Sequence, residues 1–243
     1  MQFLLSIHSK RRIMNISGFV KSSLIDYPGY ISSVIFTQGC NFKCPFCHNP
    51  DLIPMQTTSC YPESVIFDYL DRYRKMIDAV VISGGEPCLQ ADLIDFCTLL
   101  KEKGFKIKLD TNGAFPIVVQ KLIARNLVDY IAMDIKAPLN QQDYSELIGC
   151  KKTPLESIKQ TIQTIIDSSI HHEFRSTIIK EKHSANDLVS MTQAVTGCER
   201  FMGQHFSPQQ VLDPAYKMLN AYTNKELSEI ISTYNLEEKI QLR

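Results

Sequence analysis

Hydrophobic residues alternate between two patterns along the chain. Short apolar runs rich in β-branched residues predict strands, and they lie at residues 31–37, 79–82, 106–110, 130–134, 173–179 and 201–206. Between these runs, apolar residues recur every three or four positions, which predicts helices. The helical patterns lie at residues 65–77, 93–100, 117–125 and 158–166, with two more after residues 184 and 223. This alternation of strand and helix predicts a parallel sheet.

Three of the predicted helices begin at polar residues suited to cap them. Thr153 with Glu156, and Thr223 with Glu226, match the capping-box pattern. Ser184 precedes another helical stretch and can accept a hydrogen bond from a free backbone N–H of its first turn. These residues predict where the helices start.

The six strand–helix units predict an α/β fold of the partial (β/α)6 barrel type. A closed barrel has eight such units, and a doubly wound sheet is the alternative. In either fold the carboxyl ends of the strands meet at one rim. Polar candidates follow or end all six strands: Cys40, residues 83–87, residues 110–113, residues 134–136, Arg175 and residues 204–205. We therefore expect a single site at that rim.

Length and composition narrow the class of protein. The 243 residues are 44% hydrophobic and 21% charged, which excludes a disordered chain. Lys and Arg together number 26, as do Asp and Glu, so the net charge is zero and bulk nucleic-acid binding is not expected. No stretch approaches the ~20 apolar residues of a membrane span.

The first 13 residues do not read as a secretory signal. Their basic residues follow the short apolar run instead of preceding it. We expect residues 1–13 to be a flexible extension, residues 14–243 to be one domain, and the protein to be cytoplasmic.

Three of the eight cysteines are clustered at Cys40, Cys44 and Cys47, and the other five are scattered. Three thiolates on one short loop can hold three corners of a 4Fe-4S cluster and leave one iron open. A structural zinc site usually has four ligands, and His48 adjoins Cys47 too closely to reach the same ion readily. The spacing favours a cluster, with a zinc-binding interaction module as the alternative from another class.

The cysteine loop resembles the signature of radical S-adenosylmethionine (SAM) enzymes, with Phe46 before the third cysteine. Residues 37–50, which close with Cys47, His48 and Asn49, resemble the glycyl-radical-enzyme activating branch. Residues 18–29 are most similar to activators of anaerobic ribonucleoside-triphosphate reductase. Activators of pyruvate formate-lyase are also similar.

The resemblance implies a partial (β/α)6 barrel and a defined reaction. SAM chelates the open iron of the 4Fe-4S cluster, and an electron from flavodoxin or ferredoxin cleaves it to methionine and a 5′-deoxyadenosyl radical. That radical removes a hydrogen atom from a glycine of the partner enzyme. The resemblance makes anaerobic ribonucleoside-triphosphate reductase the expected partner here. A radical SAM enzyme acting on a small molecule remains an alternative.

The resemblance also implies roles for residues at the strand ends. SAM contacts fall on Phe46, Cys47, His48, Gly84, Gly85, Glu86, Lys136, Arg175 and one of Gln204 and His205. Phe46 and His48 would lie near the adenine, and Glu86 near the amino group. Asp110 and Asp134 match positions that surround a monovalent cation in the formate-lyase activator, which leaves such a cation open here. Each of these residues also has an ordinary structural interpretation, such as a helix cap, loop packing or an ion pair.

Overall fold

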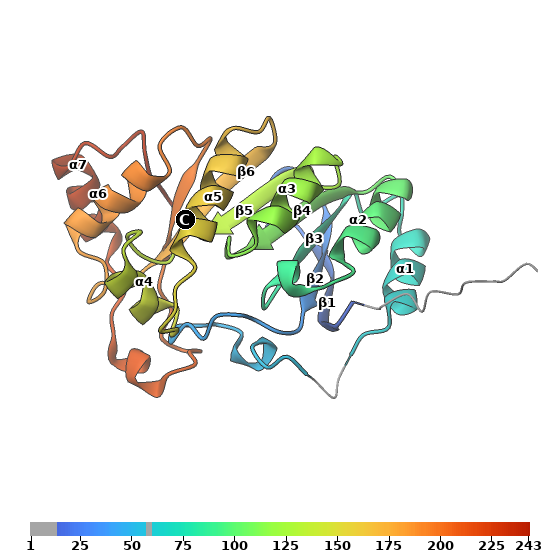
Figure 1. The fold of residues 1–243 in the computed structure, drawn as a ribbon, viewed down its shortest axis with the longest axis horizontal. Coiled ribbons are helices and arrows are strands. Elements are labelled where there is room, and N and C mark those ends of the chain that lie inside the picture. The colour runs from blue at the N-terminus through green and yellow to red at the C-terminus, as the bar shows by residue number, and fades with distance from the viewer. Residues whose placement is uncertain (1–13, 57–59) are drawn as a thin grey trace, which may run out of the picture.

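The computed structural model describes residues 14–56 and 60–243. One eight-stranded sheet runs through this part of the chain in sequence order, from β1 to β8 (Figure 1). The strands are β1 (Ile16–Ser23), β2 (Ser32–Thr37), β3 (Ala79–Gly84), β4 (Lys106–Thr111), β5 (Tyr130–Asp134), β6 (His171–Ile178), β7 (Phe201–His205) and β8 (Gln241–Leu242). Neighbours from β2 to β8 are parallel, and the six predicted strands are β2 to β7. Within the described chain no pairing joins β1 to β8, so the barrel is partial, as predicted.

Strand β1 was not predicted from the sequence. It pairs antiparallel with β2, and only its first residue, Ile16, is fully buried. Its later residues face solvent as an edge strand, so they carry no run of apolar side chains. The pairing continues past Gly18, where an added Cβ would lie 3.1 Å from the Phe36 side chain.

In the described residues, seven α-helices connect or follow the strands. They are α1 (Glu63–Arg72), α2 (Leu93–Glu102), α3 (Pro116–Ala124), α4 (Gln141–Leu147), α5 (Leu155–Ile166), α6 (Ala185–Ala194) and α7 (Asn224–Thr233). Short 3-10 turns span η1 (Pro50–Leu52), η2 (Pro87–Leu89) and η3 (Pro214–Met218). Figure 1 shows α1, α2, α3, α5 and α6 following one another along the sheet. Apolar side chains between helices and sheet form the main core, which leaves the strand ends free to carry polar groups.

Two local predictions were wrong, and each has a physical reason. Helix α1 ends at Arg72, and the chain then turns, so that Asp78 donates its backbone N–H to Ile31 O at 2.9 Å and β3 can begin. The capping box at Thr153 does not form, because its hydroxyl accepts a hydrogen bond from Gln141 Nε2 of α4 at 3.1 Å. The cap at Ser184 and the capping box at Thr223 are confirmed, and Ser184 also forms a capping box with Asp187.

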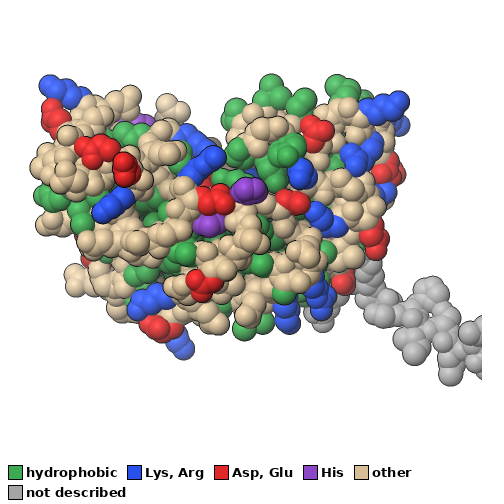
Figure 2. Space-filling view, turned by 90° about the horizontal axis from the view of Figure 1, so that it is seen from above, with side chains coloured by type: hydrophobic (Ala, Val, Ile, Leu, Met, Phe, Trp, Pro, Cys, Tyr) green, Lys and Arg blue, Asp and Glu red, His purple; other side chains and the backbone are tan. Residues whose placement is uncertain are grey.

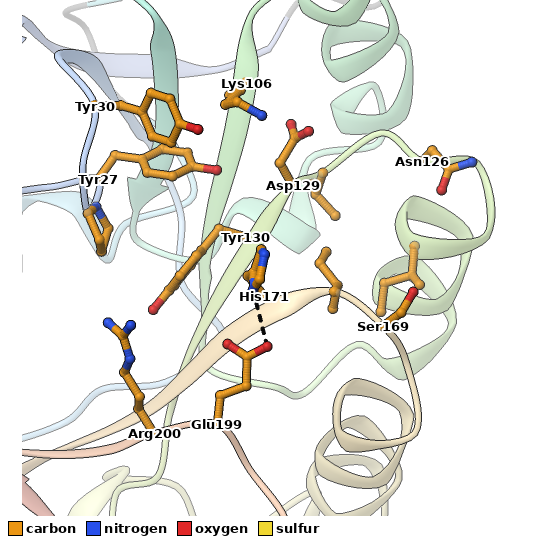
Figure 3. Close-up of a pocket in the computed structure, with 14 residues that line it drawn as sticks. Tyr27, Tyr30, Lys106, Asn126, Asp129, Tyr130, Ser169, His171, Glu199 and Arg200 are labelled. Carbon is orange, nitrogen blue, oxygen red and sulfur yellow. Dashed lines mark hydrogen bonds and ion pairs between the residues drawn. The ribbon is translucent and has the colours of Figure 1, made fainter.

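The interior of the barrel is filled at its amino-terminal end by aromatic side chains. Tyr27, in the turn between β1 and β2, is 3% exposed and packs with Tyr130 at a ring-centroid distance of 5.8 Å. Both tyrosines line a hollow of about 510 Å³, where His171 Nδ1 lies 3.2 Å from Glu199 Oε1 (Figure 3). This hollow is at the opposite end of the strands from the predicted rim, and it contains none of the predicted site residues.

Three further expectations concern the first residues, membrane spans and surface charge. The predicted extension over residues 1–13 lies outside the described residues. No helix in the described part of the chain is long and apolar enough to span a membrane. Acidic and basic side chains are interspersed over the face shown in Figure 2, which agrees with the zero net charge.

Candidate functional site

The carboxyl ends of the strands surround a hollow of about 260 Å³. Every site residue predicted from the sequence lines it except His205: Cys40, Cys44, Phe46, Cys47, His48, Gly84, Gly85, Glu86, Asp110, Asp134, Lys136, Arg175 and Gln204. These residues come from the ends of six neighbouring strands, β2 to β7, or from the loops that follow them. The parallel topology therefore brings them together across more than 160 positions of sequence.

The cysteine loop leaves the end of β2 and is held by backbone hydrogen bonds at several points. Cys40 donates its N–H to Ile53 O at 3.1 Å, and Cys47 donates to Cys44 O at 3.0 Å. Lys43 donates to Ile148 O at 2.9 Å, just after α4. Gly149 follows with a φ of +62°, and an added Cβ there would lie 2.2 Å from Lys43 O. The loop is thus clamped between the end of β2 and the end of α4.

The three clustered thiols are free and face the hollow. Burial raises the pKa of Cys40 to about 11 and that of Cys44 to about 12. Thiols in this environment stay protonated at neutral pH unless a positive charge stabilises the thiolate, which is what metal ligation provides. No three His, Cys, Asp or Glu side chains among the described residues form a site for a single metal ion. A cubane cluster binds each thiolate at its own iron, so its ligands need not converge on one point.

The two glycines at the end of β3, Gly84 within the strand and Gly85 just after it, are required by the packing of the backbone. An added Cβ at Gly85 would lie 2.2 Å from Gly39 O and 2.8 Å from Leu52 O. Gly84 has a φ of +123°, and a Cβ there would lie 2.2 Å from Thr37 N. Both glycines therefore let the turn after β3 lie against the start of the cysteine loop. Both glycines also line the hollow, and the close approach of a ligand to their backbone stays a prediction.

Glu86 ties the ends of β3 and β4 together. It is fully buried, and its Oε1 accepts hydrogen bonds from Cys88 N at 3.0 Å and Thr111 Oγ1 at 2.8 Å. Its Oε2 accepts from Asn112 N at 2.7 Å. Burial raises its pKa, although these hydrogen bonds oppose the change. The contact between Glu86 and the SAM amino group stays a prediction, and in the structure the carboxylate braces the rim.

Four charged residues form a network at the rim: Asp110 near the end of β4, Asp134 and Lys136 at and after the end of β5, and Arg175 within β6. Arg175 donates through Nε to Asp134 Oδ1 at 2.9 Å and through Nη1 to Asp110 Oδ2 at 3.3 Å. Lys136 Nζ donates to Asp134 Oδ2 at 2.8 Å. Burial opposes ionisation of both carboxylates, yet Arg175 lowers the pKa of each, with a second cation beside each one. The Asp134 carboxylate likewise raises the pKa of Lys136 against the effect of burial.

The structure separates the two candidates at the end of β7. Gln204 is the register partner of Thr177 in β6, and both line the hollow. His205 points away and is exposed, with its Nε2 2.7 Å from Asn224 Oδ1. The prediction of a SAM contact in this pair therefore narrows to Gln204, and His205 lies outside the site.

Phe46 and His48 differ in exposure. Phe46 is 4% exposed and stacks with Tyr216 of η3 at a ring-centroid distance of 6.4 Å. The Lys136 ammonium lies 5.9 Å from the Phe46 ring centroid. His48 is exposed at the edge of the hollow. Both residues are placed where a planar ligand could meet them, and their proximity to an adenine stays a prediction.

Sequence reasoning missed several groups that shape the site. Lys108, in β4, forms an ion pair with Asp110 at 2.6 Å. His183, after β6, is buried, and its Nδ1 accepts from Ile179 N at 3.0 Å. This bond makes Nε2 the donor to Lys136 O, 3.0 Å away. A lysine two positions before the strand-end Asp110 was a usable signal, because residues i and i+2 of a strand share a face. No local pattern marks His183.

Comparisons with known proteins agree with this geometry. The family model of the radical SAM superfamily matches residues 34–185. The "Putative glycyl-radical enzyme activating enzyme MJ1227" of Methanocaldococcus jannaschii is 38% identical over 220 residues, which cover 88% of this chain and 89% of that protein. The pyruvate formate-lyase-activating enzyme of Listeria monocytogenes is 36% identical over 141 residues, which cover 54% of this chain and 56% of that enzyme.

Solved structures share the fold at low sequence identity. Streptococcus suis SuiB bound to S-adenosylmethionine has a TM-score of 0.65 at 17% identity, and the match covers 86% of this chain and 49% of SuiB. QueE from Escherichia coli has a TM-score of 0.54 at 14% identity, with 95% of this chain and 94% of QueE covered. The chain thus spans about half of SuiB and nearly all of QueE, and these likenesses show the fold alone.

The family match fixes the cofactors and the class of reaction. Radical SAM enzymes use a 4Fe-4S cluster and SAM, and the three-cysteine loop with its one adjoining hollow fits both. The chain is therefore an enzyme of the radical SAM superfamily, and it belongs to the family of glycyl-radical-enzyme activating enzymes.

Proposed function

We propose that this enzyme generates a glycyl radical on a partner protein, and that the partner is an anaerobic ribonucleoside-triphosphate reductase. The observation that carries the first part is the convergence of three free thiols and a cationic network on one hollow of a partial barrel. Because β1 and β8 do not pair, the barrel is open at its side, where a peptide loop can approach. A glycine has no side chain, so its Cα hydrogen can come close to a reactive centre.

The cluster and SAM, when bound, supply the reductive cleavage and the hydrogen abstraction. The residues of this chain bind and orient them. Cys40, Cys44 and Cys47 hold the cluster and leave one iron to SAM. The cations of Arg175 and Lys136 match the SAM carboxylate, because charge-assisted hydrogen bonds to carboxylates are strong.

The charged network of the hollow is suited to binding a ligand and not to acid–base catalysis. A general acid or base works best with a pKa near the operating pH. Asp110 and Asp134 have lowered pKa values, and Lys136 has a raised one, so all three stay charged across the neutral range. Their fixed charges serve binding and orientation.

The choice of partner rests on sequence similarity. Cys47, His48 and Asn49 close the cysteine loop at the site, and this closure matches the activating branch. Residues 22–28, which favour the reductase activators, form the turn whose Tyr27 fills the other end of the barrel. That segment therefore supports the family assignment through the fold and does not contact a substrate at the hollow. A pyruvate formate-lyase is the competing partner, since its activators are also relatives.

We further propose a flavodoxin or ferredoxin as electron donor and the cytoplasm as the compartment. Low-potential carriers of this kind suit the reduction of a 4Fe-4S cluster. All eight cysteines are free thiols, in keeping with a reducing environment.

The test mixes the reconstituted enzyme, SAM and a reductant with each candidate partner in the absence of oxygen. Electron paramagnetic resonance then records the radical. We expect a glycyl doublet with the reductase, and its loss when the reductase's radical-site glycine is replaced by alanine. A doublet with pyruvate formate-lyase alone would show that the lyase, and not the reductase, is the partner. Turnover of a small molecule with no protein radical would overturn the proposal.

A further inference from the structure

Both carboxylates at the rim already have cationic partners on each of their oxygens. Asp134 Oδ1 and Oδ2 face Arg175 Nε and Lys136 Nζ at 2.9 and 2.8 Å. Asp110 Oδ2 faces Arg175 Nη1 at 3.3 Å. The remaining oxygen, Asp110 Oδ1, lies 2.6 Å from Lys108 Nζ. Each carboxylate oxygen therefore already faces a cationic donor, and a metal ion bound there would lie directly beside those cations.

Lys108 is nearly removed from solvent. Its side chain is 4% exposed, and that of Asp110 is 15% exposed. In the sheet Lys108 pairs with Val81 of β3 and Tyr130 of β5, and both of those side chains belong to the apolar cluster inside the barrel. The lysine stem therefore lies inside the barrel, and its ammonium meets Asp110 from below the hollow. Burying an ammonium is costly unless it is paired, so the pair is a fixed part of the structure.

We propose that the ammonium of Lys108 is the resident cation of this carboxylate cluster, so that the enzyme binds SAM without potassium or sodium. An ammonium and a potassium ion carry the same charge, and Lys108 supplies it from within the chain. Lys108 does not line the hollow, so it acts as a positioning residue through Asp110. The proposal rests on SAM binding in this hollow and is independent of the partner protein.

The charge of the cluster supports this assignment. Three cations, Lys108, Lys136 and Arg175, surround two carboxylates, so the network carries a net charge of plus one. One added carboxylate, such as that of SAM, would neutralise it. A metal cation would instead raise the charge to plus two in a buried setting, where like charges repel strongly.

The first test compares cations on the wild-type enzyme. SAM affinity of the reconstituted enzyme is measured by equilibrium dialysis in potassium, sodium, ammonium or choline chloride at one ionic strength. Thermal midpoints of the protein without SAM are measured in the same salts. We expect SAM affinity to change less than about twofold between salts, and the midpoint to be equal in all of them, since a ligand stabilises only where it binds. A SAM affinity severalfold higher in potassium than in choline, or a higher thermal midpoint in potassium, would overturn the proposal.

The second test removes the ammonium. In Lys108→Ala, Asp110 Oδ1 faces a space that a small cation can enter. We expect SAM affinity to fall about tenfold or more in choline, and to recover in ammonium or potassium. Lys108→Met fills the same space with an uncharged chain, so we expect its loss of affinity to persist in every salt.

The matched control is Lys106→Ala, on the same face of β4 but toward the far hollow, with its ammonium 5.3 Å from the Tyr30 ring centroid. It should bind SAM like the wild type in every salt. Crystals soaked in rubidium should show an anomalous peak beside Asp110 in Lys108→Ala and none there in the wild type. A peak there in the wild type, or an Ala variant whose affinity is high and indifferent to salt, would contradict the assignment.

Discussion

Arg175 of β6 and Asp134, the last residue of the neighbouring strand β5, are register partners, and their side chains meet at 2.9 Å. The contact joins two strands at the point where each reaches the hollow. Because Arg175 also reaches Asp110 at the end of β4, one guanidinium links three strands. The ion pairs thereby hold in place the cations that we propose to bind the carboxylate of SAM.

Removing this arginine should weaken both the fold and SAM binding. Arg175→Met leaves two partly buried carboxylates short of a partner, which should lower the free energy of unfolding by about 3 kcal/mol. Urea denaturation measures it, with Arg200→Met, exposed at the far end of the barrel, as the control. Asp134→Asn breaks the same pair and also takes the carboxylate away from Lys136, so it should destabilise the fold by itself. Because both changes remove the Arg175–Asp134 contact, the double variant should lose about 1 kcal/mol less than the sum of the two single losses. A double loss equal to that sum would show that the pair is not coupled.

The cluster should depend on three cysteines alone. Replacing Cys40, Cys44 or Cys47 by alanine removes one iron ligand, and we expect the reconstituted protein to lose most of its iron and sulfide. Cys198→Ala, half-buried and distant in sequence from the loop, should keep the wild-type content. Iron and sulfide analysis of anaerobically prepared protein checks this. Full content in any of the three variants would refute the ligand assignment.

A single methyl group at Gly85 should disrupt the site. In Gly85→Ala the new Cβ would meet backbone oxygens of Gly39 and Leu52, and neither can move without shifting the cysteine loop. We expect a loss of about 3 kcal/mol in unfolding free energy, together with poor cluster retention. Gly29→Asn, at a φ of +80° with open space around it, should lose less than about 1 kcal/mol. Similar behaviour of the two variants would argue against the close packing at Gly85.

Stability should fall on mild acidification because of His183. Burial lowers the pKa of this residue, and it stays neutral in the folded protein while donating to Lys136 O. In the unfolded chain it titrates near its ordinary pKa of about 6.5. Its contribution is therefore complete above that pH and is lost as the pH falls below it. Asp110 and Asp134 titrate only in stronger acid, since their pKa values are lowered.

Urea denaturation between pH 7.5 and about 5 separates His183 from the two aspartates, because of these three groups only the histidine titrates in that range. The variant His183→Gln keeps one donor and one acceptor but does not titrate. We expect its stability to be lower at pH 7.5 and to depend less on pH than that of the wild type. An unchanged slope in the variant would assign the acid sensitivity to other groups.

Much of the site could be predicted from the sequence because its signals are local. The spacing of Cys40, Cys44 and Cys47 lies within eight residues, and strand ends such as Asp134 follow short apolar runs. Parallel topology then determines that these ends share a rim. Neither step requires knowledge of the packing.

The remaining features depend on the tertiary structure. Whether Gln204 or His205 faces inward depends on the register of β7 against β6, which the sequence of β7 does not encode. The burial of Lys108 depends on its neighbours in the sheet, Val81 and Tyr130, which come from other parts of the chain. The sequence suggests that Glu86 is a free acceptor, but the end of β4 supplies two donors to it and Cys88 supplies a third.

The central claim is that the hollow at the strand ends binds SAM at a cluster held by the cysteine loop and cleaves it reductively. The most direct measurement is the formation of 5′-deoxyadenosine from SAM and dithionite without oxygen, followed by liquid chromatography. We predict that wild-type enzyme with a full cluster forms it and that Cys44→Ala does not. No product from the iron-replete wild type, or undiminished product from Cys44→Ala, would contradict the account.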